Sequence, residues 1–140
     1  MAGKENKAAA RRIVLEVFNA GNLAPVDQLL DSKYVDHSFP PNIPADRDGF
    51  KSVVTALRAA FPDLEYTIEH EVAEGELVAQ RILGRGTLKG EFMGMQPTGK
   101  SAVWQEMHLH RFNAEGKLVE HWGLNDDIGM LMQLGLAPPM

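Results

Sequence analysis

Two adjacent carboxylates near the end of the chain, Asp126 and Asp127, are the first residues whose position suggests chemistry. They follow a stretch, residues 118–125, that reads as a strand, and they precede apolar residues at helical spacing. A carboxylate at the end of an apolar strand meets a drier environment, which raises its pKa and suits it to proton transfer. The same position suits an N-cap, because a carboxylate there accepts a hydrogen bond from a free backbone N–H. One aspartate could cap the helix while the other faces a cavity, so the sequence leaves both roles open.

Two histidines stand two residues apart in an earlier segment. On a strand, His108 and His110 project from one side, and such a pair can ligate a metal if His121 or Glu106 supplies a third arm. The cupin form of this pattern requires a glycine six positions before the first histidine, where this chain has Ala102. The later cupin element is missing as well, so we expect no metal site and read the histidines first as hydrogen-bonded residues of a sheet.

The turn between the last two predicted strands decides what faces His108. A four-residue loop, 113–116, pairs His108 with His121, whereas a three- or five-residue loop places Trp122 and Asp126 on its side. The glycine that ends this loop permits the positive φ of a bulged form, which favours the second arrangement.

Other side chains could hold a ligand. Arg81 lies in the middle of a predicted strand, where it could bind a carboxylate or an enolate-like oxygen, although an ordinary ion pair explains it equally. An aromatic and methionine set could line a pocket for a flat apolar ligand, or pack in a core or a dimer contact: Phe61, Phe92, Met93, Met95, Trp104 and Trp122.

Helical periodicity dominates the first part of the chain. It predicts one helix that ends before Gly21, a short one that begins near Pro25, and a third that Asp46 or Asp48 caps and Pro62 ends. Residues 34–41 read as irregular.

From residue 64 the period changes to two. Residues 64–72 form the first predicted strand, with Leu64, Tyr66, Ile68, His70 and Val72 on one face. Further strands are predicted over 76–87, 101–112 and 118–125, and a short final helix ends at Gly135. Helices first and strands afterwards indicate an α+β fold, with helices on one face of a sheet and a pocket between the layers.

Length and charge narrow the function classes. At 140 residues the chain suits one domain, 1–140, and its net charge of −5 disfavours nucleic acid and anionic lipid as partners. The absence of cysteine excludes thiol chemistry and disulfides. The sequence has no long apolar run, P-loop, dinucleotide fingerprint or serine-hydrolase motif. We expect a soluble, cytoplasmic protein.

Several ordered segments resemble the SnoaL-like polyketide cyclases. They extend over nearly the whole chain: residues 34–37, 61–64, 90–94, 97–100 and 120–135, where a tryptophan stands four residues before Asp126. The resemblance implies the fold of nuclear transport factor 2 and ketosteroid isomerase. In that fold, N-terminal helices pack on a strongly curved mixed or antiparallel sheet around an apolar cavity, commonly in a homodimer.

The resemblance also implies a reaction and a set of residues. Founding members of the family close a polyketide ring by intramolecular aldol condensation without metal or organic cofactor. Asp126 matches the family's acid/base residue, His108 its cavity histidine, and His37 a further histidine near the cavity mouth. One departure is Leu88, which stands where many relatives carry a histidine.

These observations lead to one hypothesis and two alternatives. We expect a cofactor-independent enzyme acting on a small, largely apolar carbonyl compound, with Asp126 as acid or base and His108 and His37 assisting. Its substrate would be held by Trp122, Trp104, Arg81, Phe61, Phe92 and Met95. The alternatives are a hydrolase or isomerase on the same scaffold, such as an epoxide hydrolase, and a domain that only binds a ligand or dimerises.

Overall fold

The first helices precede the four long strands along the chain and one short helix follows them, as the sequence pattern predicts. The computed structural model describes residues 2–137. Its helices are α1 (Ala2–Arg12), which continues into the π-helical segment η1 (Ile13–Asn19), then α2 (Val26–Leu29), α3 (Arg47–Ala60) and α4 (Asp127–Gln133). Its strands are β1 (Leu30–Asp36), β2 (Glu65–Glu74), β3 (Leu77–Thr87), β4 (Ser101–Phe112) and β5 (Leu118–Asn125). None of the helices described is long and apolar enough to cross a membrane.

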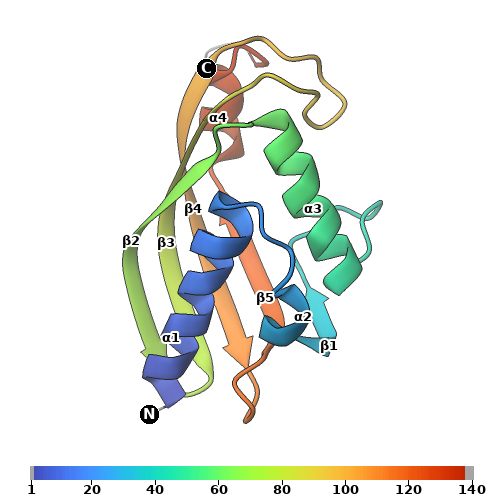
Figure 1. The fold of residues 1–140 in the computed structure, drawn as a ribbon. Coiled ribbons are helices and arrows are strands. Elements are labelled where there is room, and N and C mark those ends of the chain that lie inside the picture. The colour runs from blue at the N-terminus through green and yellow to red at the C-terminus, as the bar shows by residue number, and fades with distance from the viewer. Residues whose placement is uncertain (1, 138–140) are drawn as a thin grey trace.

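The strands form one mixed sheet in the order β1-β5-β4-β3-β2. β1 runs parallel to β5, and the other neighbours are antiparallel. The first three helices lie together over one face of the sheet, and the long strands bend around them (Figure 1). This arrangement confirms the predicted α+β class with N-terminal helices on a curved sheet.

Strand β1 corrects the prediction of irregular structure for residues 34–36, whereas residues 37–41 lie outside helices and strands as predicted. It pairs with β5 at Val35 and Asp36, opposite Glu120 and His121. Asp36 and His121 are 85 residues apart in the sequence, so no local alternation signals the pairing. This edge strand forms because it pairs with β5, and the β-propensity of its own residues does not predict it.

A bulge in β2 corrects the predicted face of residues 64–72. The register with β3 slips after Ile68, which leaves Glu69 as an extra residue. Beyond the bulge the faces exchange, so Val72 is 66% exposed while Glu71 turns inward. The predicted inward position of Val72 is therefore wrong.

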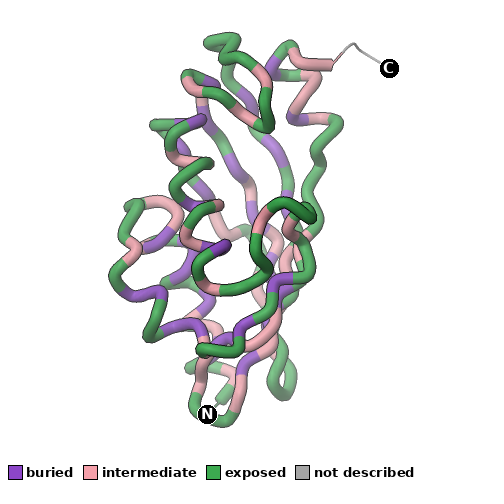
Figure 2. Tube along the Cα trace, turned by 90° about the vertical axis from the view of Figure 1, so that its right-hand side faces the viewer, coloured by how far each residue is buried: buried purple, intermediate pink, exposed green. Residues whose placement is uncertain are grey.

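Two apolar clusters fill the space between the helices and the sheet. The first includes Ala10, Val17, Leu30, Tyr34, Phe50, Val78, Phe112 and Leu118, and the second includes Val14, Phe61, Tyr66, Ile82, Leu88, Trp104, Met130 and Leu134. Buried and exposed positions alternate along the strands, as expected for a sheet that packs on one side (Figure 2).

A tryptophan in the second cluster lies flat against a glycine on the neighbouring strand. Trp104 pairs with Gly84 across β4 and β3, and it is 1% exposed. A Cβ added at Gly84 would lie 2.5 Å from Cε2 of this indole. The glycine therefore makes room for the ring.

We predict that Gly84→Ala lowers the free energy of unfolding by about 1–3 kcal/mol, because the added methyl group overpacks the core against a fixed ring. Urea unfolding monitored by Trp fluorescence and circular dichroism measures the change. The matched control is Gly3→Ala in α1, where the new Cβ would meet only Ala73 Cβ at 3.6 Å. A Gly84→Ala protein as stable as the wild type would mean that the indole is free to move.

Candidate active site

A continuous line of polar side chains crosses the inner face of the sheet from β1 through β5 to β4. The parallel pairing of β1 and β5 brings Asp36 opposite His121. The antiparallel pairing of β5 and β4 brings His121 opposite His110, and Gly123 opposite His108. Paired residues project from the same face of a sheet, so three strands contribute to one polar line under the helices.

The hairpin between β4 and β5 sets this arrangement. Its loop has five residues, 113–117, as one of the two bulged forms predicts. A register shift next to the loop leaves Val119 as an extra residue. This bulge moves the pairing of the rest of β5 by one residue, so its side chains exchange faces. His108 therefore shares a face with His121, and the predicted placement of Trp122 beside it is wrong.

Three short hydrogen bonds join two carboxylates through two imidazoles. His121 Nδ1 lies 2.8 Å from Asp36 Oδ2, and His121 Nε2 lies 2.7 Å from His108 Nδ1. His108 Nε2 lies 2.7 Å from Glu106 Oε1. We call these four residues the relay. The His108 side chain is its most exposed member at 16%, whereas the Asp36 side chain is 1% exposed, so the relay meets solvent at His108.

Asp36 accepts more hydrogen bonds than the one from His121. The Tyr34 hydroxyl, the Ser38 hydroxyl and the Ser38 backbone N–H all donate to this carboxylate. Burial by itself would raise the pKa of Asp36, but His121, Ser38 and Tyr34 together outweigh it and lower the pKa to about 2. The carboxylate is therefore held ionised inside the protein. Burial and the neighbouring Asp36 raise the pKa of Tyr34, which remains a neutral donor.

Glu106 is the buried carboxylate at the other end. The Trp104 indole Nε1 donates to its Oε2 at 2.6 Å. Burial favours the neutral acid, but hydrogen bonds from His108, Trp104 and Tyr66 outweigh it and lower the pKa of Glu106. Burial and the nearby Glu106 raise the pKa of Tyr66. Trp104, predicted as a substrate contact, thus acts here as a hydrogen-bond donor to the relay.

His110 belongs to a second, separate line of contacts. Arg11 pairs with Glu71 at 2.7 Å, and Glu71 accepts a hydrogen bond from the Gln80 amide nitrogen at 2.8 Å. The Gln80 oxygen then faces His110 Nε2 at 3.1 Å, so this nitrogen carries the proton. Burial, followed by the two relay histidines, lowers the pKa of His110 well below its usual range. His110 is neutral.

The two aspartates after β5 have different surroundings. Asp126 is exposed and caps α4, since its Oδ1 accepts a hydrogen bond from Gly129 N at 3.0 Å. The predicted dry environment of Asp126 is therefore wrong, and the N-cap interpretation holds. Asp127 is also exposed, but partial burial of its carboxyl and the negative charges of Glu106 and Asp126 raise its pKa.

Three other predicted site residues lie on the outer face of the sheet. His37 Nε2 is 2.9 Å from Glu120 Oε2, and its ring stacks on Trp122 with 4.9 Å between ring centres. Arg81 donates two hydrogen bonds to Gln105. His37 and Trp122 line one depression together with His108, as predicted, whereas Arg81 is not among its lining residues.

The remaining predicted contacts pack beside the relay. Phe61 is fully buried, with its ring centre 5.3 Å from those of both Phe92 and Trp104. Met95 forms an isolated bridge with Phe92. These residues cover the end of the inner face where Trp104 reaches Glu106.

Comparison with known proteins identifies the family. The model of the SnoaL-like polyketide cyclases matches residues 8–134. The chain belongs to this family.

Solved structures agree with this assignment. IdmH from Streptomyces antibioticus, described as "a putative polyketide cyclase", is 35% identical, and the match covers 93% of this chain and 98% of IdmH with a TM-score of 0.80. AclR from Streptomyces galilaeus, described as "a putative hydroxylase", is 30% identical over 99% of this chain and 85% of AclR, with a TM-score of 0.84. TsrD from Streptomyces laurentii, at 19% identity, 96% coverage of this chain, 97% of TsrD and a TM-score of 0.87, shares the fold. A search of curated proteins finds no significant match.

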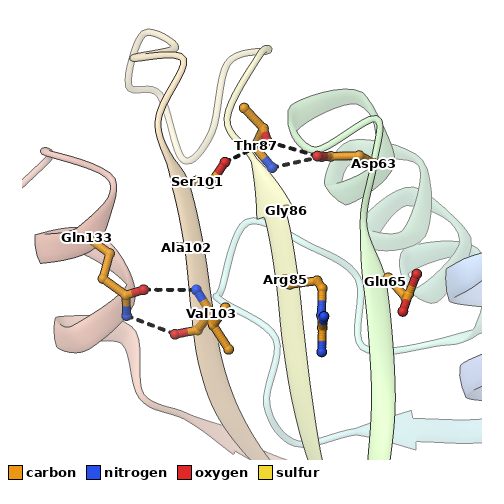
Figure 3. Close-up of a pocket in the computed structure, with 9 residues that line it drawn as sticks. All are labelled: Asp63, Glu65, Arg85, Gly86, Thr87, Ser101, Ala102, Val103 and Gln133. Atoms are coloured by element: carbon orange, nitrogen blue, oxygen red, sulfur yellow. Dashed lines mark hydrogen bonds between the residues drawn. The ribbon is translucent and has the colours of Figure 1, made fainter.

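Two depressions lie on the outer face of this SnoaL-like sheet. One, of about 360 Å³, is lined by His37, Ala79, Met107, His108, Leu109, Trp122, Gly123 and Leu124. The other is more polar and includes Arg85, Thr87 and Ser101 (Figure 3). At its rim the Gln133 amide of α4 makes two 2.8 Å hydrogen bonds with the backbone of Val103.

The metal interpretation of the paired histidines finds no support in the geometry. Within residues 2–137, no group of three or more histidine and acidic side chains is arranged to hold a metal ion. Both ring nitrogens of His108 are already engaged in the relay.

Sequence reasoning missed the buried end of the relay. The sequence identifies Asp36 only within a family segment, Glu106 only as a possible metal ligand, and His121 as a possible metal ligand or cross-strand partner of His108. Two unusual acids inside strands, in Tyr34-Val35-Asp36 and Trp104-Gln105-Glu106, are the signal that was available. A charged residue two positions after an aromatic residue, on the same buried strand face, requires a partner.

We predict that the stability difference between the wild type and Asp36→Asn depends on pH. The folded pKa of Asp36, about 2, lies below its ordinary 3.8, so its ionised form stabilises the fold above about pH 4, and this contribution disappears as the pH falls towards 2. The difference in the free energy of unfolding should shrink by about 2 kcal/mol between about pH 5 and about pH 2.

Urea unfolding of both proteins across this range measures the difference. Other acids titrate in both proteins and cancel. A difference that stays constant with pH would show that Asp36 is not held ionised.

Proposed function

We propose that this SnoaL-like protein is a cofactor-independent enzyme that closes a ring by intramolecular aldol condensation on a small, largely apolar carbonyl or polyketide-like compound. The observation that carries the proposal is the relay, in which two ionised carboxylates are buried behind an imidazole that meets solvent. Ionised groups are costly to bury, and a line of them that ends at an accessible histidine suits proton transfer better than stability.

The chemistry requires two proton transfers in one turnover. A base removes a proton next to a carbonyl, the resulting enolate attacks a second carbonyl, and an acid protonates the new alkoxide. We assign the base to a carboxylate at the start of α4 and the acid to His108. Phe92 and Met95, which are partly exposed, would orient the chain for attack, and the buried Phe61 and Trp104 would support them from behind.

Asp126 and Asp127 are distinguishable candidates for the base. The resemblance to the family favours Asp126, which is exposed and caps α4. Proximity to Glu106 and the raised pKa favour Asp127, since a weaker acid is the stronger proton acceptor. We retain Asp126 as the predicted base and use Asp127 as its matched comparison.

We predict that Asp126→Asn lowers turnover about 100-fold or more, while the protein keeps its stability. Asparagine caps a helix about as well as aspartate, so this substitution removes the base and retains the cap. The measurement is ring closure of a linear poly-β-carbonyl compound. Liquid chromatography with mass detection records the conversion of the linear compound into a cyclic isomer of the same mass. Thermal unfolding measures the stability of each variant.

Asp127→Asn is the control and should lower turnover less than tenfold. Loss of turnover only in Asp127→Asn would move the base to that residue. Full activity in both variants, and in His108→Gln, would contradict the enzymatic proposal and favour the ligand-binding alternative.

We also propose a homodimer that buries the outer face of the sheet. Val103, Met107, Trp122 and Leu124 are exposed there, Leu124 by 80%. The depression that contains Trp122 has no Asp, Glu, Lys or Arg in its lining. An uncharged apolar patch on a chain of net charge −5 can face a copy of itself across a two-fold axis without burying like charges. His37 and Trp122 would then lie at the contact, in the depression that His108 also lines.

We predict that Leu124→Glu converts a dimer into a monomer, because it introduces two like charges near the two-fold axis. Light scattering after size exclusion measures the mass, and Leu15→Glu, at an exposed position on η1 (51%), is the control. A wild-type mass of one chain at micromolar concentration would contradict the dimer.

A further inference from the structure

The relay contains one more proton than two neutral imidazoles supply. Each of its three hydrogen bonds needs one hydrogen between the two heavy atoms. Neutral His108 and His121 bring one N–H each, which accounts for two bonds. The third hydrogen must reside on a carboxyl group or convert one imidazole into imidazolium.

The partners of Asp36 disfavour a protonated carboxyl group at that end. Its Oδ1 accepts from the Ser38 backbone N–H, which can only donate, and from the Ser38 hydroxyl. Its Oδ2 accepts from Tyr34 and faces His121. A proton on Oδ2 could point only at His121 Nδ1, and the three other donors to this carboxyl all stabilise its charged form, so the geometry favours the carboxylate.

The same reasoning applies to Glu106. Its Oε2 faces the Trp104 indole N–H, which is a donor only, and its Oε1 faces His108. Both carboxyl groups thus have hydrogen-bond partners on both oxygens that favour the ionised form, in agreement with their lowered pKa values.

We propose that His108 and His121 share one extra proton, so that the pair holds a single positive charge between Asp36 and Glu106, and that Asp36 is the positioning residue that retains this proton. The positive pair offsets one of the two buried negative charges. Asp36 acts through His121, because it lies at the buried end of the relay and is screened from solvent.

Other titratable groups near the pair do not remove the need for this charge. Tyr34 on β1 and Tyr66 on β2 are neutral donors with raised pKa values. His110 on β4 is neutral, and its ring centre lies 5.0 Å from that of His121. Asp127 at the start of α4 is acidic and adds negative potential at the Glu106 end. The charged Arg11 and Glu71 pair with each other beyond Gln80.

The extra proton gives the proposed reaction its acid, and only this use rests on the proposed function. When the enolate attacks the second carbonyl, a carbon–carbon bond forms and the carbonyl oxygen becomes an alkoxide. His108 gives the alkoxide one proton, which leaves the imidazole pair neutral. The proton that the base removed from carbon then returns to the pair, so the cycle closes without net gain or loss.

Nuclear magnetic resonance of protein labelled with ¹⁵N at histidine tests the proton count without any substrate. At about pH 7.5 we expect the four ring nitrogens of His108 and His121 to carry three protons, seen as ring ¹⁵N shifts and as slowly exchanging N–H signals far downfield. His110 should show the single tautomer with the proton on Nε2. Two protons on the pair in the wild-type protein would overturn the inference.

Substitution of Asp36 tests its positioning role. Asp36→Asn keeps the shape but removes the charge, so the pair should fall to two protons at the same pH. Tyr34→Phe retains the Asp36 carboxylate, so the pair should keep its three protons. This second variant tests the role of Asp36 if Asp36→Asn does not fold. Asp63→Asn is the matched control, because Asp63 is a carboxylate with a lowered pKa that binds Thr87 away from the relay.

Turnover separates this inference from the proposed function. If the protein closes rings, Asp36→Asn should lower kcat about tenfold or more with less than a twofold change in KM, and it should alter the pH profile. Three protons without any turnover would sustain the inference and contradict the function. Turnover by a wild-type protein with only two protons on the pair would support the function and contradict the inference. An unchanged proton count in Asp36→Asn would refute the role of Asp36.

Discussion

The arrangement of this protein depends on the need to neutralise two buried carboxylates. Asp36 and Glu106 lie on the inner face of a sheet whose other inward side chains are largely apolar. Neither carboxylate has an arginine or lysine partner among the described ion pairs, and two imidazoles connect them instead. The burial of ionised acids is tolerated only when each oxygen has donors and a compensating charge is close. The edge strand β1, the bulge in β5 and the position of Trp104 all supply such donors.

The two bulges have consequences well beyond their own residues. The extra residue in β5 exchanges the faces of the strand, so that His121 turns inward and Trp122 outward. The extra residue in β2 does the same for Glu71, which then reaches Gln80 and orients His110. One extra residue in each strand thus turns polar side chains to the inner face, where they meet polar side chains of the neighbouring strands.

Periodicity predicts most of the secondary structure but not these lines. The helices and the four long strands follow from apolar spacing, and the family assignment follows from segments such as 90–100 and 120–135. The pairing of β1 with β5 joins residues 85 apart, Asp36 and His121, and no local signal reports such a contact. The register of β5 against β4 depends on a bulge at Val119. The glycine in the preceding loop makes a bulge possible but does not show at which residue it occurs. The predicted dry environment of Asp126 is wrong because a carboxylate at this position in the sequence suits a helix N-cap as well as a catalytic site.

The Gln133 side chain completes a sheet that would otherwise end open. β5 stops pairing with β4 at Asn125, so the start of β4 has no strand on that side, and the Gln133 amide takes both the N–H and the C=O of Val103. A primary amide presents a donor and an acceptor side by side, as a peptide group does, and α4 is thereby fastened in the position of a missing strand. Free strand edges recruit foreign chains and start aggregates. One glutamine therefore shields this edge against misassembly while it anchors the helix that begins with the two aspartates.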